Sequence, residues 1–169
     1  EDAYGYYSRP GLAYLLAGEV PQKQLYPLPR DYPASIRLKF LTAAAAAIDP
    51  AGHRLQLSDG RMISYDRLLL ATGAQASRLD LPGANLAGVV KLDTMQDVQQ
   101  ILKLARRGET AVVVGGGITA LELAEGLHSL GMHVHYLLRG ERYWSNVLDE
   151  VESGIIERRL REAGLHIHT

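Results

Sequence analysis

The feature that most limits what this chain can fold into is a run of glycines between an apolar strand and a helix. Residues 111–114 read Ala-Val-Val-Val, which is typical of a strand buried on both faces. Gly115–Gly117 follow, and helix-forming residues then extend over 118–130, where Gly131 marks a helix end. Residues 133–138 form another apolar segment. This order predicts a βαβ unit with parallel strands.

The segments on either side continue the same alternation. Thr94 and Asp97 have the spacing of a capping box, and apolar residues at helical spacing follow until Gly108. Residues 149–163 predict another helix, and a further strand begins at Leu165. The second half of the chain is therefore predicted to be α/β, with a parallel sheet and right-handed crossovers.

The first half carries shorter segments separated by Pro and Gly. Residues 12–17 predict a short helix, and the alternation over 36–40 predicts a half-buried strand. Residues 53–57 and 61–64 flank a Ser-Asp-Gly turn and predict a β-hairpin. The continuous apolar run over 68–71 predicts a strand buried on both faces.

Composition excludes several classes of function. The formal charge of −1 leaves no basic surface for a nucleic acid. No apolar run approaches the roughly 18 residues of a membrane-spanning helix. Cysteine is absent, which removes disulfides, thiolate metal sites and any cysteine nucleophile from these residues. We therefore expect a cytoplasmic domain with no nucleic-acid or membrane partner.

The glycine run fits G-x-G-x-x-A, a permitted form of the dinucleotide-binding fingerprint. Gly115 allows the tight turn, Gly117 lets the backbone approach a pyrophosphate, and Ala120 keeps the helix close to the strand. The start of the helix offers N–H groups and a positive dipole end to phosphates. The alternative is a tight strand-to-helix turn with no ligand.

The fingerprint also expects an acidic residue after the second strand, where it holds a ribose 2′-hydroxyl. Leu138 stands there instead, followed by Arg139 and Arg142. Two guanidinium groups and no carboxylate at that position favour a 2′-phosphate, and thus NADPH over NADH. The alternative is that both arginines face water.

Three further motifs accompany the glycine turn in a set order. They are Tyr7-Ser8-Arg9-Pro10-Gly11-Leu12, then Tyr65-Asp66-Arg67 running into Leu68-Leu69-Leu70-Ala71-Thr72-Gly73-Ala74, and then Leu81-Pro82-Gly83. Over nearly its whole length the chain resembles the FAD-dependent pyridine nucleotide-disulfide oxidoreductase family. The resemblance is to the branch of rubredoxin, ferredoxin and nitrite reductase flavoproteins.

The resemblance implies an enzyme that binds two nucleotides. By similarity, Arg9, Pro10, Thr72 and Gly73 would contact FAD, and the turn at Gly115 would hold NAD(P)H. The implied fold is α/β, with partial FAD-domain elements and a β-hairpin over residues 1–92. A Rossmann-like βαβ NAD(P)-binding unit would occupy residues 93–169.

Two residues of the helix after the glycine turn match family positions. Glu122 matches the glutamate near the nicotinamide, and Ile118 matches the position that gates the flavin face. The alternative for Glu122 is an exposed carboxylate of the first helical turn, favoured there by the helix dipole.

The chain also departs from the family pattern. The cysteines of the disulfide-reductase and peroxide-handling members are absent, so no residue here supports a thiol mechanism. Tyr14 stands where some members of the branch have a lysine near the flavin. The first FAD-binding βαβ unit and the C-terminal interface domain also lack counterparts, so we expect a central segment of a longer enzyme. Glu1 would then be the acidic residue that closes the missing unit.

Two side-chain groups were weighed as further sites. His133, His135, His166 and His168 lie at the starts of predicted neighbouring strands. Four imidazoles on one face can bind a metal, but polar strand starts at the sheet end away from the nucleotide are the favoured interpretation. Tyr143 and Trp144 after the second strand are interpreted as packing residues.

The sequence predicts hydride transfer from NAD(P)H to FAD and then to a small-molecule or redox-protein acceptor, with no catalytic side chain required. One alternative is a flavin-free NAD(P)-binding sensor or regulatory module. Another is a non-catalytic fragment that acts through assembly, because uncovered apolar edges favour a homo-oligomer.

Overall fold

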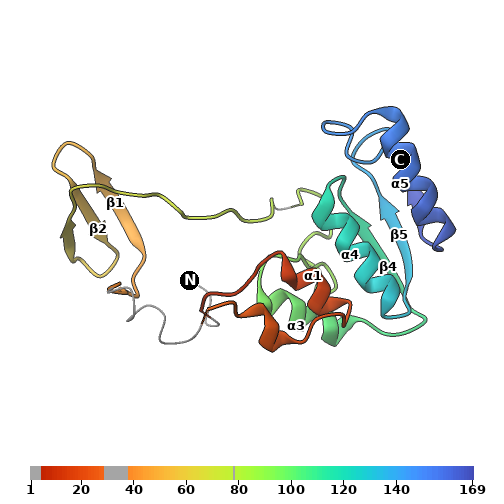
Figure 1. Ribbon diagram of the computed structural model, residues 1–169, viewed down its shortest axis with the longest axis horizontal. Coiled ribbons are helices and arrows are strands. Elements are labelled where there is room, and N and C mark those ends of the chain that lie inside the picture. Colours follow the sequence, from red (N-terminus) through yellow and green to blue (C-terminus); the bar gives the residue numbers. More distant parts are fainter. Residues whose placement is uncertain (1–4, 29–37, 78) are drawn as a thin grey trace. The chain divides into compact units, whose positions relative to one another are not determined.

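The computed structural model describes residues 5–28, 38–77 and 79–169. The chain forms two compact units, one over residues 28–75 and the other from residues 2–27 together with 76–169. Each unit has its own three-stranded sheet. Figure 1 labels the strands β1 and β2 of one sheet and β4 and β5 of the other. The first sheet is antiparallel and the second is parallel.

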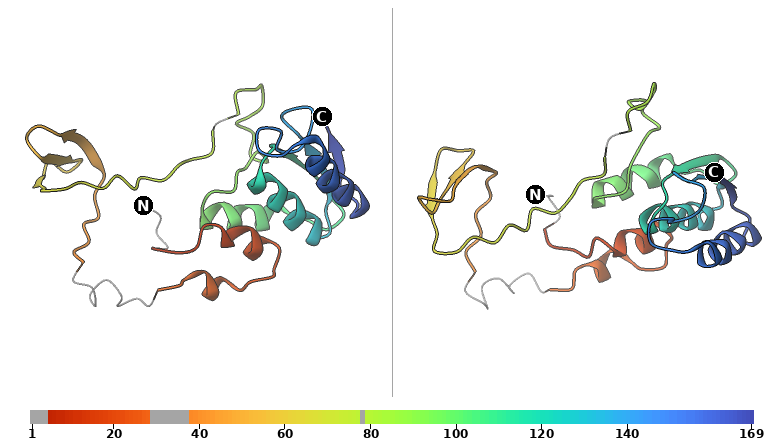
Figure 2. Two further views of the ribbon diagram at one scale, coloured as in Figure 1. Left: turned by 45° about the horizontal axis from the view of Figure 1, so that its top comes forward. Right: turned by 90° about the horizontal axis from the view of Figure 1, so that it is seen from above.

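The unit over residues 28–75 is built on a small antiparallel sheet, which Figure 2 shows from two further sides. Its strands are β1 (Ala45–Asp49), β2 (Arg54–Leu57) and β3 (Met62–Ser64), in that order across the sheet. The turn between β2 and β3 places Gly60 at a φ of 86°, a conformation that glycine adopts without strain. The predicted β-hairpin is confirmed.

Two strand predictions in this unit fare differently. The apolar run at 68–71 is not a strand, and its middle residues Leu69 and Leu70 are 86% and 65% exposed. A strand requires hydrogen-bonding neighbours, and neither sheet of the described residues places one beside this run. The strand predicted over 36–40 is also wrong where it can be judged, because residues 38–40 form no strand, while 36 and 37 lie outside the described residues.

The parallel sheet of the second unit follows the predicted alternation. Its strands are β4 (Thr110–Val114), β5 (His133–Leu137) and β6 (His166–His168). The helix α4 (Ile118–Ser129) connects β4 to β5, and α5 (Glu150–Glu162) connects β5 to β6. Strand order β4-β5-β6 with parallel pairing confirms the predicted βαβ organisation.

Among the described residues of its own unit, one face of this sheet is covered and the other is exposed. Val113, Val134 and Tyr136 are buried on neighbouring strands, whereas Val112 and Val114 on the opposite face of β4 are 61% and 47% exposed. Two right-handed crossovers that progress in one direction place both helices on the same side of a sheet. The prediction that β4 is buried on both faces is therefore wrong for one face.

The N-terminal segment packs against the helices of this second unit. Figure 1 shows α1 (Gly11–Leu16) beside α3 (Met95–Leu104) and α4, and the short 3-10 helix η1 (Gln22–Leu25) follows it. A Cβ added to Gly126 of α4 would meet Leu16 at 3.4 Å, so the absent side chain allows this close approach. The Tyr7 hydroxyl accepts from the Met95 backbone N–H at 3.0 Å. The short helix and the capping box of α3 are confirmed.

None of the helices in the described ranges is long and apolar enough to cross a membrane.

Candidate functional site

The glycine turn is packed as tightly as the fingerprint requires. A Cβ placed on Gly115 would lie 2.6 Å from the Cβ of Ala120, which is closer than real Cβ contacts. The Gly115 N–H donates to the Leu137 carbonyl at 3.0 Å, which fixes the turn to the end of β5. This geometry agrees with the fingerprint, in which Gly115 allows the tight turn and Ala120 keeps α4 close to β4.

The start of α4 leaves its backbone N–H groups available. Gly117 is the N-cap residue in extended conformation, and no side chain caps the helix. The first turn of α4 holds no acidic residue, so no carboxylate there repels an anion that approaches these N–H groups. Glu122 lies beyond that first turn and is half-buried, which argues against its interpretation as an exposed first-turn carboxylate.

A cavity of about 270 Å³ opens beside this turn. It brings together the glycines and both arginines that the sequence analysis singled out, and it adds a tryptophan. Its lining is Gly116, Gly117, Arg139, Arg142, Trp144, Ser145 and Asn146. No carboxylate lines it, so the two guanidinium groups give it a positive charge.

Arg142 is held at this cavity with unused hydrogen-bonding capacity. Its Nη2 donates to the Ser145 carbonyl at 3.4 Å, while its Nε is buried and has no hydrogen-bond partner. A buried donor without a partner costs stability unless another group satisfies it. A phosphate oxygen is the acceptor that suits a guanidinium group.

The loop that carries Arg142 is fixed by α5. The buried side chain of Glu157 accepts from the Tyr143 N–H at 2.8 Å, and the Ser153 hydroxyl donates to the Tyr143 carbonyl at 2.7 Å. The Tyr143 ring is 1% exposed and packs against Tyr136. With Tyr143 directed into the core, its two neighbours in the chain line the cavity.

A second cavity, of about 430 Å³, is lined by residues of the first turns of α4 and by the N-terminal segment. Its lining joins the Arg-Pro motif to Ile118 and Glu122 of α4, which match family positions at the flavin face and near the nicotinamide. The lining residues are Arg9, Pro10, Leu12, Ala13, Leu92, Asp93, Ile118, Thr119 and Glu122. Residues more than a hundred positions apart in the chain thus meet at one cavity.

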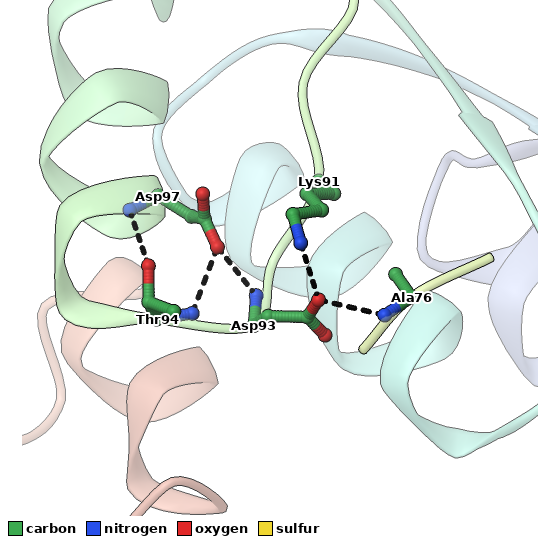
Figure 3. A network of polar contacts seen from close by, with 5 residues as sticks. All are labelled: Ala76, Lys91, Asp93, Thr94 and Asp97. Atoms are coloured by element: carbon green, nitrogen blue, oxygen red, sulfur yellow. Dashed lines mark hydrogen bonds and ion pairs between the residues drawn. The ribbon is translucent and has the colours of Figure 1, made fainter. Parts of the chain in front are cut away.

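Asp93 connects this cavity to the neighbouring backbone (Figure 3). Its Oδ2 accepts from the Ala76 N–H and from the Lys91 Nζ, each at 2.8 Å. The Asp93 N–H in turn donates at 2.9 Å to Asp97, whose carboxylate also caps α3 through the Thr94 N–H. Burial opposes ionisation of Asp93, but Lys91, Ala76 and the Arg9 charge together lower its pKa.

Two carboxylates of α4, those of Glu122 and Glu125, lie close enough to interact electrostatically. Partial burial, and then the charges of Glu122 and Glu19, raise the pKa of Glu125. Burial, and then the charges of Glu125 and Glu122, raise the pKa of the Tyr143 hydroxyl. The region around Glu122 is therefore negative, in contrast to the positive cavity beside Gly117.

Thr72 and Gly73 lie in the other compact unit, over residues 28–75. Both are exposed, and Gly73 has a φ of 70°. The structure therefore brings Arg9 and Pro10 together with Ile118 and Glu122, whereas the assignment of Thr72 and Gly73 to the flavin stays a prediction.

Sequence reasoning missed two residues of these cavities. Asp93 is not part of any motif identified in the sequence, and no local pattern links it to Arg9. The interpretation of Tyr143 and Trp144 as packing residues is confirmed, since Tyr143 is buried and Trp144 packs against the core, but Trp144 also lines the cavity. One signal in the sequence could have identified Trp144. Arg142 and Trp144 are the two chain neighbours of Tyr143, so a buried Tyr143 leaves both of them to line a common surface.

The histidines weighed above as an alternative metal site come together in part. The rings of His135 and His166 stack with centroids 4.9 Å apart, and His135 Nδ1 lies 2.8 Å from His168 Nε2. Among the described residues, no group of three or more His, Cys, Asp or Glu has an arrangement that would hold a metal ion.

A parallel sheet with a glycine turn, a positive cavity at that turn and a second cavity along the same helix define a dinucleotide-binding domain. The chain belongs to the pyridine nucleotide-disulphide oxidoreductase family, which it matches over residues 6–169. The family predicted from the motifs is thereby confirmed.

Several curated relatives are ferredoxin or rubredoxin reductases. The chain is 32% identical over 154 residues to the ferredoxin–NAD(+) reductase component of the biphenyl dioxygenase system of Paraburkholderia xenovorans, covering 90% of this chain and 38% of that protein. It is 27% identical over 161 residues to rubredoxin–NAD(+) reductase of Pseudomonas putida, covering 94% and 42%. The chain thus spans less than half the length of these relatives.

Solved structures agree with this relationship. The covalent putidaredoxin reductase–putidaredoxin complex contains a chain that matches with a TM-score of 0.89 and 32% identity, covering 96% of this chain and 40% of that one. A ferredoxin reductase from Rhodopseudomonas palustris matches with a TM-score of 0.86 and 29% identity, covering 96% and 40%.

Proposed function

We propose that this chain is the central part of an FAD-dependent NAD(P)H oxidoreductase. The observation that carries the proposal is the 430 Å³ cavity, because Arg9 and Pro10 line it together with Ile118 and Glu122. By family resemblance, the first pair is assigned to FAD, Ile118 to the position that gates the flavin face, and Glu122 to the nicotinamide. A cavity that holds both sets of residues suits a reaction in which two rings must meet.

The chemistry belongs to the cofactors, since NAD(P)H supplies a hydride and FAD accepts it. The residues of this chain bind and orient the two groups. The turn at Gly115–Gly117 binds the diphosphate through backbone N–H groups at the start of α4. The close Gly115–Ala120 contact and the buried, partnerless Nε of Arg142 both fit such a ligand.

The coenzyme we propose is NADPH in preference to NADH. Arg139 and Arg142 line the cavity beside the turn, and Leu138 replaces the acidic residue that would hold a 2′-hydroxyl. A phosphate there gains charge-assisted hydrogen bonds that a hydroxyl lacks. Arg142→Ala is expected to weaken NADPH binding about tenfold or more while leaving NADH binding nearly unchanged.

The matched control for that variant is Arg158→Ala, an exposed arginine of α5 that does not line the cavity. It is expected to leave both affinities unchanged. Equal weakening of NADPH and NADH by Arg142→Ala would count against a 2′-phosphate contact.

The electron acceptor we propose is a small redox protein. This rests on relatives that are named as ferredoxin and rubredoxin reductases. The expected cytoplasmic location and a possible homo-oligomer belong to the same proposal.

The decisive experiment is a visible absorption spectrum of the protein after incubation with FAD and desalting. A retained flavin spectrum that bleaches when NADPH is added without oxygen supports the oxidoreductase. A colourless protein that still binds NADPH in a calorimetric titration favours the flavin-free sensor instead. A protein that binds neither compound contradicts both.

A further inference from the structure

We propose that Trp144 is a phosphate-binding residue whose indole N–H donates to the diphosphate of the bound coenzyme. The inference rests on the proposed function and adds a residue that neither the family motif nor the glycine fingerprint contains. It concerns the 270 Å³ cavity beside the start of α4, which Trp144 lines together with Gly117.

The indole presents its polar edge to the glycine turn. A Cβ placed on Gly117 would lie 3.9 Å from Trp144 Nε1, and no other heavy atom outside the turn comes within 4 Å of that position. Gly117 is the residue at which the backbone approaches the pyrophosphate in this fingerprint. The N–H donor thus borders the place where phosphate oxygens would lie.

The backbone of Trp144 is held in an unfavourable conformation. Its φ is 49°, in the left-handed region that bulky residues rarely adopt. The Trp144 carbonyl accepts from the N–H groups of Val147 and Leu148 at 2.8 and 3.0 Å, so the following turn maintains this conformation. Such strain is concentrated at ligand-binding positions, where the surrounding structure determines it.

The neighbouring residues hold the ring in place and set the charge of the cavity. Tyr143, which α5 fixes through Glu157 and Ser153, packs edge-on against the indole with centroids 6.1 Å apart. Arg139 and Arg142 line the same cavity. A neutral donor in a cavity that two guanidinium groups and a helix start also line serves an anion, because each of the other groups favours negative charge.

Stacking of the adenine ring on the indole is the competing role. In that case the face of the indole, rather than its N–H edge, would be the part used. The position of Nε1 nearest to Gly117 favours donation to the diphosphate. Because NADPH and NADH share the diphosphate, the contact predicts an equal contribution to both affinities.

The test compares Trp144→Phe, which keeps an aromatic ring but removes the N–H, with Trp144→Ala. Affinities for NADPH and NADH are measured by isothermal titration calorimetry, and circular dichroism spectra verify folding. We expect Trp144→Phe to weaken both coenzymes by the same factor, about tenfold, because a hydrogen bond to a charged group is lost. The preference for NADPH should not change.

Three results would overturn the inference. Unchanged affinities in Trp144→Phe with a loss in Trp144→Ala would indicate stacking. A loss confined to NADPH would place the contact at the 2′-phosphate. Unchanged affinities in both variants would remove Trp144 from the site altogether.

The wild-type protein provides a second readout, because Trp144 is its one tryptophan. Inorganic pyrophosphate should change the indole emission in a saturable titration, and NADP(+) should compete for the same site. Emission that does not respond to saturating pyrophosphate contradicts the inference. If the wild-type protein binds neither coenzyme, the proposed function fails. If the wild type binds both coenzymes and Trp144→Phe binds them equally well, only this inference fails.

Discussion

The backbone N–H of Tyr143 donates to Oε1 of Glu157 at 2.8 Å, and this bond joins the loop at the nucleotide cavity to the helix that follows it. The second oxygen of Glu157 pairs with Arg161 at 3.0 Å, so the buried carboxylate is satisfied on both sides. The Glu157 side chain is only 11% exposed. Glu157 therefore fixes the loop without itself lining the cavity.

Glu157→Ala is expected to lower the free energy of unfolding by about 1–3 kcal/mol, because it leaves the Tyr143 N–H buried and unpaired. It should also weaken coenzyme binding, because Arg142 and Trp144 flank Tyr143, whose backbone Glu157 would no longer hold. Chemical denaturation and calorimetric titration measure the two effects.

Glu157→Gln and Glu162→Ala are the controls for that prediction. The glutamine keeps an acceptor for the Tyr143 N–H and should recover most of the coenzyme affinity. Glu162 is an exposed residue of the same helix, paired only with Arg159 in the described contacts, so its loss should change little. If Glu157→Ala binds coenzyme as tightly as wild type, the positioning role is wrong.

Gly115→Ala is expected to disrupt the turn, because the new Cβ would lie 2.6 Å from the Cβ of Ala120. The strand and helix must then separate, at a cost of about 1–3 kcal/mol, as in other overpacked cores. Coenzyme affinity should fall at the same time. Thermal denaturation and calorimetry provide the measurements.

The double variant Gly115→Ala/Ala120→Gly tests whether that contact is the cause. Ala120→Gly alone should cost about 1 kcal/mol of helix stability. If the clash is responsible, the double variant loses less than the sum of the two single variants. Strict additivity would show that Gly115 matters for another reason.

Local signals were enough to predict most elements of the α/β part. Thr94 and Asp97 form the capping box that their spacing indicates, and Asp149 caps α5 where the predicted helix begins. Ala120 contacts the turn as the fingerprint requires. Each of these features joins residues that are only a few positions apart, so a short stretch of sequence is enough to predict it.

Features that depend on distant residues were not predictable in the same way. An apolar run such as Leu68–Leu70 indicates a buried strand only if neighbouring strands exist to pair with it. Asp93 joins Ala76, Lys91 and the Arg9 charge, and no spacing rule connects those positions. The separate roles of Tyr143 and Trp144 depend on α5, which fixes the backbone between them.

Asp93→Asn is expected to change the acid dependence of stability. The pKa of Asp93 is lowered in the folded state, from an ordinary value of 3.8. Its ionised form therefore stabilises the fold above about pH 4, and this contribution is lost as the pH falls below that value. Asp93→Asn should lack this loss and should be less stable at neutral pH, by about 1 kcal/mol.

Denaturation midpoints between pH 2 and 7 measure that difference. Asp80→Asn, at an exposed position outside the network of Figure 3, is the matched control and should follow the wild-type curve. If the denaturation midpoints of wild type and Asp93→Asn change in parallel with pH, the proposed role of this carboxylate is wrong.

Tyr136→Phe is expected to keep or raise the stability of the core. The side chain is fully buried, and its hydroxyl has no hydrogen-bond partner. A desolvated hydroxyl without a partner costs about 1–3 kcal/mol, which offsets the packing lost with one oxygen atom.

The same residue predicts an effect of alkaline pH. Burial, and then the charge of Tyr143, raise the pKa of Tyr136 well above its ordinary value of 10.0. Its neutral form is therefore favoured by folding, and that stabilisation is fully present below pH 10 and decreases as the pH rises further. Tyr136→Phe should lose less stability than wild type above pH 10, whereas Tyr6→Phe, at a residue that is 71% exposed, should behave as wild type.

Denaturant titrations at pH 8 and above pH 10 measure both effects. A loss of more than about 1 kcal/mol at pH 8 would mean that the hydroxyl has a stabilising partner, since removal of a partnerless group cannot cost that much.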